Sequence, residues 1–252
     1  MNKRLMFSAA LVMALLSANA QKRAFTIEDL YRVKGVSSVS LSPDGKTVCY
    51  TASSSDLKNQ KSGSDIYIMN ADGSHTKALT EDGKSSSAVW SKDGKSIFFT
   101  NYEKGTAQIF RMNLTTCETE QVTDYELGIG SPVISPDERY IAFTAEVYPD
   151  LGADAKANKA RMEKKEQGPV QAHIADKLLY RHWTSYNDGR CNHLILFDTQ
   201  TKTYKDLTPG NYSLIFVVGG GITYQFSPDS KEICFVSNHD EHQEASTNAD
   251  LW

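Results

Sequence analysis

Five side chains in one short stretch combine aromatic and charged chemistry: Tyr180, Arg181, His182, Trp183 and Asp188. Aromatic rings and arginine are the side chains that most often anchor ligands and protein partners. We therefore predict that this stretch faces a peptide substrate or another domain. The alternative is a covering loop whose rings pack on the sheet beneath it while the charges stay in water, and the sequence leaves both open.

Two carboxylates offer a second kind of contact. Glu241 and Glu244 lie in a polar loop at 238–248, where a carboxylate can accept hydrogen bonds from the amino group of a substrate. The neighbouring His239 and His242 lack the spacing of a metalloprotease motif. The sequence therefore predicts no metal here, and it leaves open whether the two carboxylates contact a substrate or belong to a solvated loop.

The sequence contains no motif for acyl transfer. The nucleophile elbow Gly-x-Ser-x-Gly does not occur, and a serine needs such a turn and an oriented base to become nucleophilic. Two Asp-Gly-Lys-Ser stretches, at 82–85 and 93–96, lack the upstream glycine of a phosphate-binding loop and are interpreted as turns. We predict no catalytic residue and no cofactor within this chain.

An internal repeat supplies the elements that must position these residues. Four segments read Ser-Pro-Asp-Gly or a close variant, and they begin at Ser42, Ser91, Ser135 and Ser227, which lie 49, 44 and 92 residues apart. A period of roughly 40–50 residues is typical of a four-stranded propeller blade. Pro, Asp and Gly favour a tight turn, so each segment predicts the hairpin between the first two strands of a blade.

Apolar and β-branched runs surround each turn, as strands packed on both faces require. The second strands are expected at 47–51, 96–100, 140–144 and 232–236, and the third strands at 65–69, 108–112 and 194–198. The chain is therefore predicted to be an all-β protein, a β-propeller with three full blades and a partial fourth that opens before Trp252. Because propellers typically need 4–8 blades to close, we expect the chain to be a piece of a longer protein.

An insertion interrupts the third blade at about 146–192. A helix is predicted over 153–167, and it has almost no apolar face, so by itself it should be solvated. Connections between second and third strands lie on the same propeller face as the links between blades. We therefore expect the insertion to share a face with the links 127–130 and 218–221 and with the loop 238–248.

The amino terminus has the features of a secretory signal peptide over residues 1–20. Lys3 and Arg4 precede an apolar run at 5–16, and Ala18-Asn19-Ala20 is a small-residue cleavage site. The apolar run is too short to span a membrane stably. The mature chain, 21–252, is thus expected to be exported, periplasmic in a Gram-negative source and otherwise secreted, with no membrane attachment after cleavage.

Charge and cysteine content give two further predictions. Loss of Lys3 and Arg4 changes the formal charge from −4 to −6, and a mildly acidic chain is not expected to bind nucleic acid. Cys49 and Cys234 occupy the same position in the repeat, which places them too far apart for a disulfide, and both are expected to be small buried side chains.

These residues together resemble a known family. The segment Phe25-Thr26-Ile27-Glu28-Asp29-Leu30, followed by the turn at Ser42, is similar to the amino-terminal propeller of prolyl oligopeptidase family serine peptidases. Within that family, Val147-Tyr148-Pro149, Leu179-Tyr180-Arg181-His182-Trp183 and the last seven residues, 246–252, resemble the dipeptidyl-peptidase V branch, which is often labelled acylaminoacyl peptidase-like. The resemblance covers residues 24–252.

The resemblance implies an exported peptidase of two domains. Its propeller would precede an α/β-hydrolase domain with a Ser-Asp-His triad, restrict entry to small peptides and help to form the substrate pocket, while the hydrolase domain releases dipeptides from peptide amino termini. This chain lacks the hydrolase domain, so by itself it is expected to be inactive. The alternative is a non-enzymatic, TolB-like periplasmic propeller that serves as a binding module or scaffold, and a homodimer stays open.

Overall fold

The computed structural model describes residues 23–170, 172–175, 178, 180–214 and 223–252. The predicted signal peptide at 1–20 and the link at 218–221 lie outside these residues. Among the residues described, no helix is long and apolar enough to cross a membrane.

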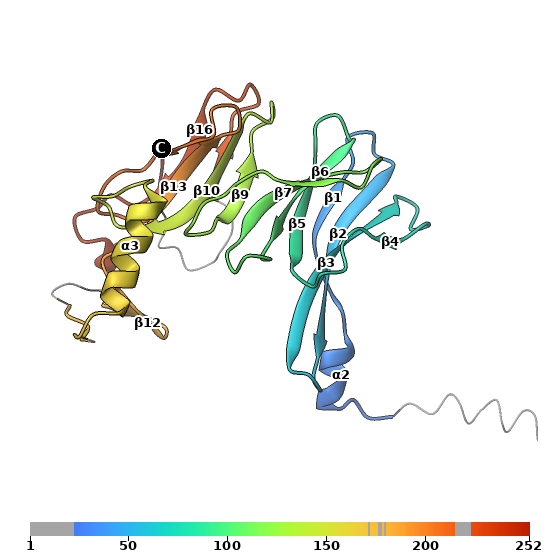
Figure 1. The fold of residues 1–252 in the computed structure, drawn as a ribbon, viewed down its shortest axis with the longest axis horizontal. Helices are drawn as coiled ribbons and strands as arrows, with labels where there is room; N and C mark the ends of the chain where they lie inside the picture. Colours follow the sequence, from blue (N-terminus) through green and yellow to red (C-terminus); the bar gives the residue numbers. More distant parts are fainter. Residues whose placement is uncertain (1–22, 171, 176–177, 179, 215–222) are drawn as a thin grey trace, which may run out of the picture.

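Four antiparallel sheets follow one another along the chain (Figure 1), and within each sheet the strands pair in sequence order. The first sheet contains β1 (Gly35–Leu41), β2 (Thr47–Asp56), β3 (Lys61–Asn70) and β4 (Lys77–Ala78), and the second contains β5 (Ser85–Trp90), β6 (Ser96–Asn101), β7 (Gln108–Asn113) and β8 (Thr119–Gln121). The third contains β9 (Gly130–Ile134), β10 (Tyr140–Val147), β13 (Cys191–Asp198) and β14 (Thr203–Asp206), and the fourth contains β15 (Tyr224–Phe226), β16 (Ile233–Ser237) and β17 (Asp250–Leu251). The predicted all-β propeller, with three complete blades and part of a fourth, is confirmed.

The described residues contain few other elements. Helix α2 (Ile27–Arg32) precedes the first sheet, and helix α3 (Ala155–Glu166) and the small hairpin of β11 (Arg181–His182) and β12 (Ser185–Tyr186) lie between β10 and β13. A short 3₁₀ helix, η1 (Gln243–Ala245), lies between β16 and β17. Strands β10 and β13 stay paired as far as Val147 and Cys191, so the insertion occupies 148–190.

The repeated turn has the same hydrogen bonds in all four blades. In the first, the Ser42 hydroxyl donates to Asp44 Oδ1 at 2.6 Å and accepts from the Thr47 amide at 2.9 Å, while Asp44 Oδ1 also accepts from the Lys46 amide at 3.1 Å. Equivalent bonds occur in the turns that begin at Ser91, Ser135 and Ser227. Ser and Asp therefore define this turn, which explains why it also forms at Ser91, where lysine replaces proline.

The last position of the turn needs a left-handed backbone. Gly45 and Gly94 supply it with φ of 71° and 68°, but Glu138 and Ser230 adopt φ of 62° with a side chain present, which is uncommon outside glycine. In these two turns the side chain reaches the preceding blade. Glu138 Oε1 accepts from the Lys92 amide at 2.5 Å, and Ser230 Oγ accepts from the Asp137 amide at 3.0 Å.

The core consists of three layers, one between each pair of successive sheets. The first layer contains Cys49, Ile66, Ile97 and Phe99, the second Ile109, Tyr125, Ile141 and Phe143, and the third Leu194, Leu214, Tyr224 and Phe226. All six residues of β6 are buried, as expected for a strand with a sheet on either side.

The prediction for the cysteines is half right. Cys49 is fully buried against the second sheet, where its thiol lies 3.7 Å from the Ala88 carbonyl oxygen. Cys234 is exposed, which contradicts the expectation of burial. The reason is that the face of β16 that carries Cys234 has no sheet packed on it among the described residues, whereas the same face of β2 has one.

Two structures project from one edge of the sheets (Figure 1). One is the long β2–β3 hairpin with α2 at its end, and the other is the insertion with α3. Both connect the second and third strands of a blade. Gly130 at the start of β9 pairs with Thr144, close to the end of β10 where the insertion begins. The insertion and the link that enters β9 therefore lie on the same face, as predicted.

Candidate functional site

The insertion begins with a turn that fixes helix α3. Asp154 Oδ1 accepts a hydrogen bond from the Ala157 amide at 2.9 Å, which satisfies a free donor of the first helical turn. Asn158, the one buried residue of the helix, accepts from the Tyr148 amide at 2.6 Å and donates to the carbonyls of Gly152 and Asp154. The rest of the helix faces solvent or is half-buried, so the predicted solvated helix is confirmed.

Charged pairs hold α3 against the start of the insertion and against a link between sheets. Arg161 binds Asp150 through two hydrogen bonds of 2.7 Å, and its guanidinium lies 4.7 Å from the centre of the Tyr148 ring. Lys159 pairs at 3.4 Å with Glu126, which belongs to the link between the second and third sheets. Bidentate geometry makes the Arg161 pair the stronger of the two.

The hairpin of β11 and β12 presents an aromatic side chain at its tip. Arg181 pairs with Tyr186 and His182 with Ser185, which leaves Trp183 and Thr184 as the turn. Trp183 has a φ of 48° and is 86% exposed. A large side chain in the left-handed region is unusual, and such strain is found most often at functional sites.

Arg190 holds the base of this hairpin. Its Nε donates to both carboxylate oxygens of Asp188 at 3.0 and 2.9 Å, and its Nη1 lies 3.1 Å from Glu146 Oε2 in β10. Lys165 of α3 donates to the Asp188 carbonyl at 3.2 Å. Asp188, predicted to face a substrate, therefore has its carboxylate engaged with Arg190.

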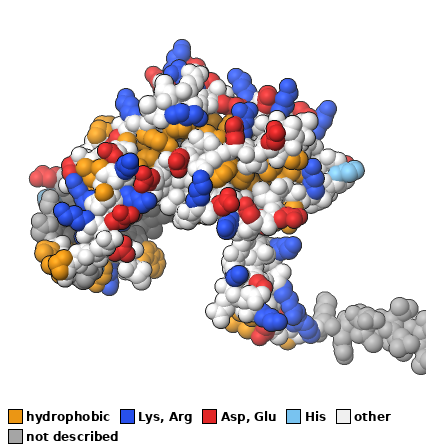
Figure 2. Space-filling model, viewed as in Figure 1, with side chains coloured by type: hydrophobic (Ala, Val, Ile, Leu, Met, Phe, Trp, Pro, Cys, Tyr) orange, Lys and Arg blue, Asp and Glu red, His pale blue; other side chains and the backbone are white. Residues whose placement is uncertain are grey.

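Large apolar side chains gather on the outside of the insertion. We define the insertion patch as the members of this segment that are 46–90% exposed: Val170, Ile174, Leu178, Tyr180, Trp183 and Tyr186. Arg181 is exposed beside them. Of the predicted residues, the structure thus brings Tyr180, Arg181 and Trp183 together at the surface, and the His182 side chain lies outside the description. Apolar side chains are visible at the ends of both projections in Figure 2.

Sequence reasoning missed the other four members of the patch: Val170, Ile174, Leu178 and Tyr186. The signal was present, because an apolar residue recurs about every four positions through a segment with no strand alternation. Such spacing in a loop does not by itself show whether the apolar side chains are exposed or buried.

The two predicted glutamates lie in the loop between β16 and β17. Glu241 is exposed and forms no hydrogen bond or ion pair with the described residues, and Glu244 lies in η1 with its side chain outside the description. Their loop is held by His239, whose ring lies 3.9 Å from that of Tyr212 and 4.1 Å from that of Trp252, centre to centre.

A buried histidine, also missed from the sequence, joins the end of the insertion to the link between the third and fourth sheets. His193 is fully buried, and its Nδ1 lies 2.7 Å from Asp206 Oδ2 while its Nε2 lies 3.0 Å from the Gly210 carbonyl oxygen. Burial opposes the charged form, but Asp206, the Cys191 thiol and the Gly210 carbonyl outweigh it and raise the pKa of His193 to about 9. Both ring nitrogens therefore donate.

Comparison with known proteins identifies the family of this chain. Residues 19–167, more than half of it, match the family model described as the TolB beta propeller domain, PD40. The chain belongs to this propeller family. It is 29% identical over 224 residues to dipeptidyl-peptidase 5 of Porphyromonas gingivalis, covering 86% of this chain and 32% of that protein. It is 25% identical to the uncharacterized peptidase YuxL of Bacillus subtilis, covering 92% and 34%.

Solved structures agree on the fold. The uncomplexed acylaminoacyl peptidase of Pyrococcus horikoshii superposes with a TM-score of 0.60 at 17% identity, over 88% of this chain and 31% of that one. The propeller is thus related to those of peptidases. The chain spans about a third of the length of the relatives it matches.

Proposed function

We propose that this chain is the propeller part of an exported serine peptidase that releases dipeptides from peptide amino termini. Two relatives that match most of the chain are named as a dipeptidyl-peptidase and a peptidase, and each is about three times as long. In this proposal the remaining length supplies an α/β-hydrolase domain with the catalytic serine, and the propeller restricts which peptides reach it. The chain alone is inactive, because the sequence contains no nucleophile elbow.

The insertion patch is the observation that supports this proposal best. Exposed large apolar side chains that cluster in one segment commonly mark an interaction site, and six of them lie within 170–186. The patch belongs to an insertion on the face that carries the links between blades. We infer that its partner is the hydrolase domain of the same longer protein, with the peptide substrate passing beside it.

The activity is tested by comparing two forms of the protein. The longer protein should release dipeptides from chromogenic dipeptidyl substrates, and replacing the serine of its nucleophile elbow with alanine should abolish the release. Residues 21–252 alone should give no turnover. Activity of residues 21–252, or a longer protein without a hydrolase domain, would contradict the proposal.

The role of the patch has a separate test in the longer protein. Trp183→Ala should lower kcat/KM about tenfold while the propeller stays folded, because an aromatic anchor at the surface of the propeller contributes to the contact between domains and little to the folding of the propeller. Thr201→Ala is the matched control, since this exposed residue lies in the turn at the opposite end of β13. If the two variants have equal kinetics, the insertion patch covers the sheet beneath it and does not contact the hydrolase domain.

We propose export because residues 1–20, which lie outside the described residues, have the features of a secretory signal peptide. The mature protein should begin at Gln21, and it should be found in the periplasm of a Gram-negative source or in the medium otherwise. Mass spectrometry of the native amino terminus and fractionation of the cells measure both. A protein that keeps residues 1–20 and remains inside the cell would contradict this.

A second candidate is a non-enzymatic TolB-like propeller that serves as a binding module. The match to the TolB beta propeller family favours it. The reading frame beyond Trp252 separates the two, since further blades and a stop codon would indicate the binding module, and a hydrolase sequence the peptidase.

A further inference from the structure

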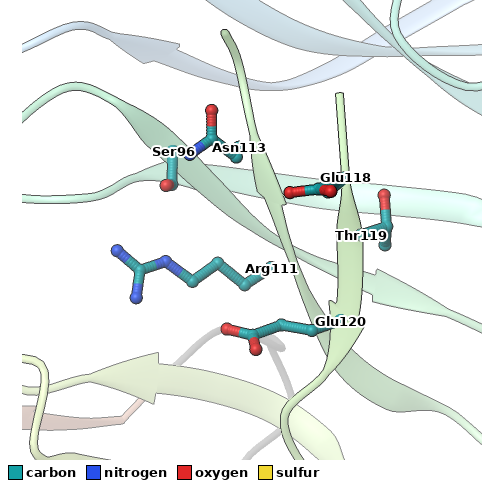
Figure 3. Close-up of a pocket in the computed structure, with 6 residues that line it drawn as sticks. All are labelled: Ser96, Arg111, Asn113, Glu118, Thr119 and Glu120. Carbon is teal, nitrogen blue, oxygen red and sulfur yellow. The ribbon is translucent and has the colours of Figure 1, made fainter. Parts of the chain in front are cut away.

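A polar cavity of about 440 Å³ lies on the second blade, apart from the insertion, and its lining comes from β6, β7, the turn after β7 and β8 (Figure 3): Ser96, Arg111, Asn113, Glu118, Thr119 and Glu120. Ser96 pairs with Asn113 across β6 and β7, and Arg111 pairs with Glu120 across β7 and β8. Paired residues share a face of a sheet, and here it is the face toward the third blade.

Arg111 forms no ion pair with the described residues. It is half-buried, its guanidinium lies 5.3 Å from the centre of the Phe98 ring, and no carboxylate of the described residues lies within 4.0 Å of it. The other half-buried arginines, Arg139, Arg161 and Arg190, each pair with a carboxylate. A guanidinium carries five donors in a plane that matches a carboxylate, and those of Arg111 are available to a ligand.

Two carboxylates lie beside Arg111 on the same face of the sheet. Glu118 is held by Thr116, whose hydroxyl donates to Glu118 Oε2 at 3.1 Å. Glu120, opposite Arg111 on β8, points into the same space (Figure 3). Asn113 uses its Oδ1 to accept from the Thr115 and Thr116 amides, so its amide nitrogen remains to donate. The cavity thus contains the guanidinium of Arg111 and the carboxylates of Glu118 and Glu120, and these groups form no ion pair with one another.

We propose that this cavity binds a small zwitterion, an α-amino acid or a short unblocked peptide. Its α-carboxylate would pair with Arg111, and its ammonium group would lie between Glu118 and Glu120. A phosphate would be repelled by the two carboxylates and a divalent cation by the guanidinium, whereas a molecule that carries both charges can pair with the guanidinium and with the carboxylates. The site does not depend on the proposed peptidase activity.

Calorimetry with glycylglycine tests the proposal on the protein as expressed from its gene. Glycylglycine should bind, and Arg111→Gln should weaken binding about tenfold or more, because a charge-assisted hydrogen-bond pair is lost. Glycylglycinamide, which lacks the carboxylate, should bind the unmodified protein about as weakly as glycylglycine binds Arg111→Gln. N-acetylglycylglycine, which lacks the ammonium group, should bind the unmodified protein about as weakly as glycylglycine binds the double variant Glu118→Gln and Glu120→Gln. Glu103→Gln, an exposed acid outside the cavity, should bind as the unmodified protein does.

Two results would overturn the proposal: no heat of binding at millimolar glycylglycine, or equal binding of glycylglycine and glycylglycinamide. Melting temperatures of the variants verify that they are folded. Since Arg111 contacts a core ring, Arg111→Lys serves as a second variant that keeps the charge and loses the planar fork, and it should bind more weakly than the unmodified protein and more tightly than Arg111→Gln.

Discussion

At the scale of single residues, His193 shows how a charge is retained inside this propeller. The residue directly precedes the apolar run of a third strand, at the position where the first two blades have Asp65 and Gln108. Each of these polar side chains binds the chain that returns from the fourth strand: Asp65 accepts from the Thr80 hydroxyl, and Gln108 accepts from the Thr123 hydroxyl and donates to the Tyr125 carbonyl. His193 makes the equivalent contacts with Asp206 and Gly210.

The stability of the protein should therefore fall as the pH rises through about 9. The pKa of His193 is raised from 6.5 to about 9 in the folded state, so its stabilisation is complete below pH 6.5 and is lost as the folded ring deprotonates. A shift of this size corresponds to ~3 kcal/mol in the free energy of unfolding. Urea unfolding between pH 6 and pH 10 measures it, and His193→Asn should remove most of the dependence in that range. An unchanged profile in the variant would exclude His193 as its source.

The sequence predicts residues of this kind only in part. A polar residue before each apolar third strand is visible in the repeat, and so is the threonine that ends each fourth strand. The contacts between them depend on how the links between blades fold back. Links have no periodic pattern, so neither the partners of His193 nor its charge follow from the sequence.

At the scale of elements, the repeated turns join neighbouring blades. Glu138→Ala keeps the left-handed backbone and removes the acceptor for the Lys92 amide, so the free energy of unfolding should fall by about 1 kcal/mol. Glu138→Gly also loses that acceptor but relieves the backbone, and its loss should be smaller. Chemical denaturation of both variants measures the difference. If glycine proved the more destabilising, strain at this position would not matter.

The insertion should loosen when its basal ion pairs are removed. Arg190→Ala leaves Asp188 and Glu146 without their guanidinium partner, so amide hydrogen exchange should accelerate in 180–190 while the β-sheets keep their protection. Arg161→Ala, which removes a bidentate pair at the other end of the insertion, is the control and should affect α3 instead. Uniform acceleration across the third blade would show that the insertion is not a separate unit.

Elements with a local cause could be predicted, and the others could not. The turns, the strands that flank them and helix α3 follow from residue type and spacing. The β11–β12 hairpin has two paired residues on each side and a tryptophan in its turn, so it carries neither strand alternation nor a common turn motif. It depends on Arg190 and Lys165 from outside the hairpin.

At the scale of the molecule, each sheet buries one face against the next, and this order leaves two faces uncovered in the described residues. On the first sheet, Val36, Val39 and Leu41 are 57–66% exposed. On the fourth, Cys234 is exposed, whereas the residues at its position in the other three blades, Cys49, Phe98 and Ala142, are at most 5% exposed.

Cys234 therefore reports whether a further sheet packs on the fourth. In residues 21–252 a thiol reagent such as dithionitrobenzoate should modify Cys234 and the exposed Cys117 rapidly, while Cys49 should stay protected, because it is buried and burial raises the pKa of its thiol to about 11. In the longer protein that we propose, Cys234 should become as protected as Cys49, and Cys117 should remain reactive. A Cys234 that still reacts in the longer protein would show that the propeller does not continue from this face.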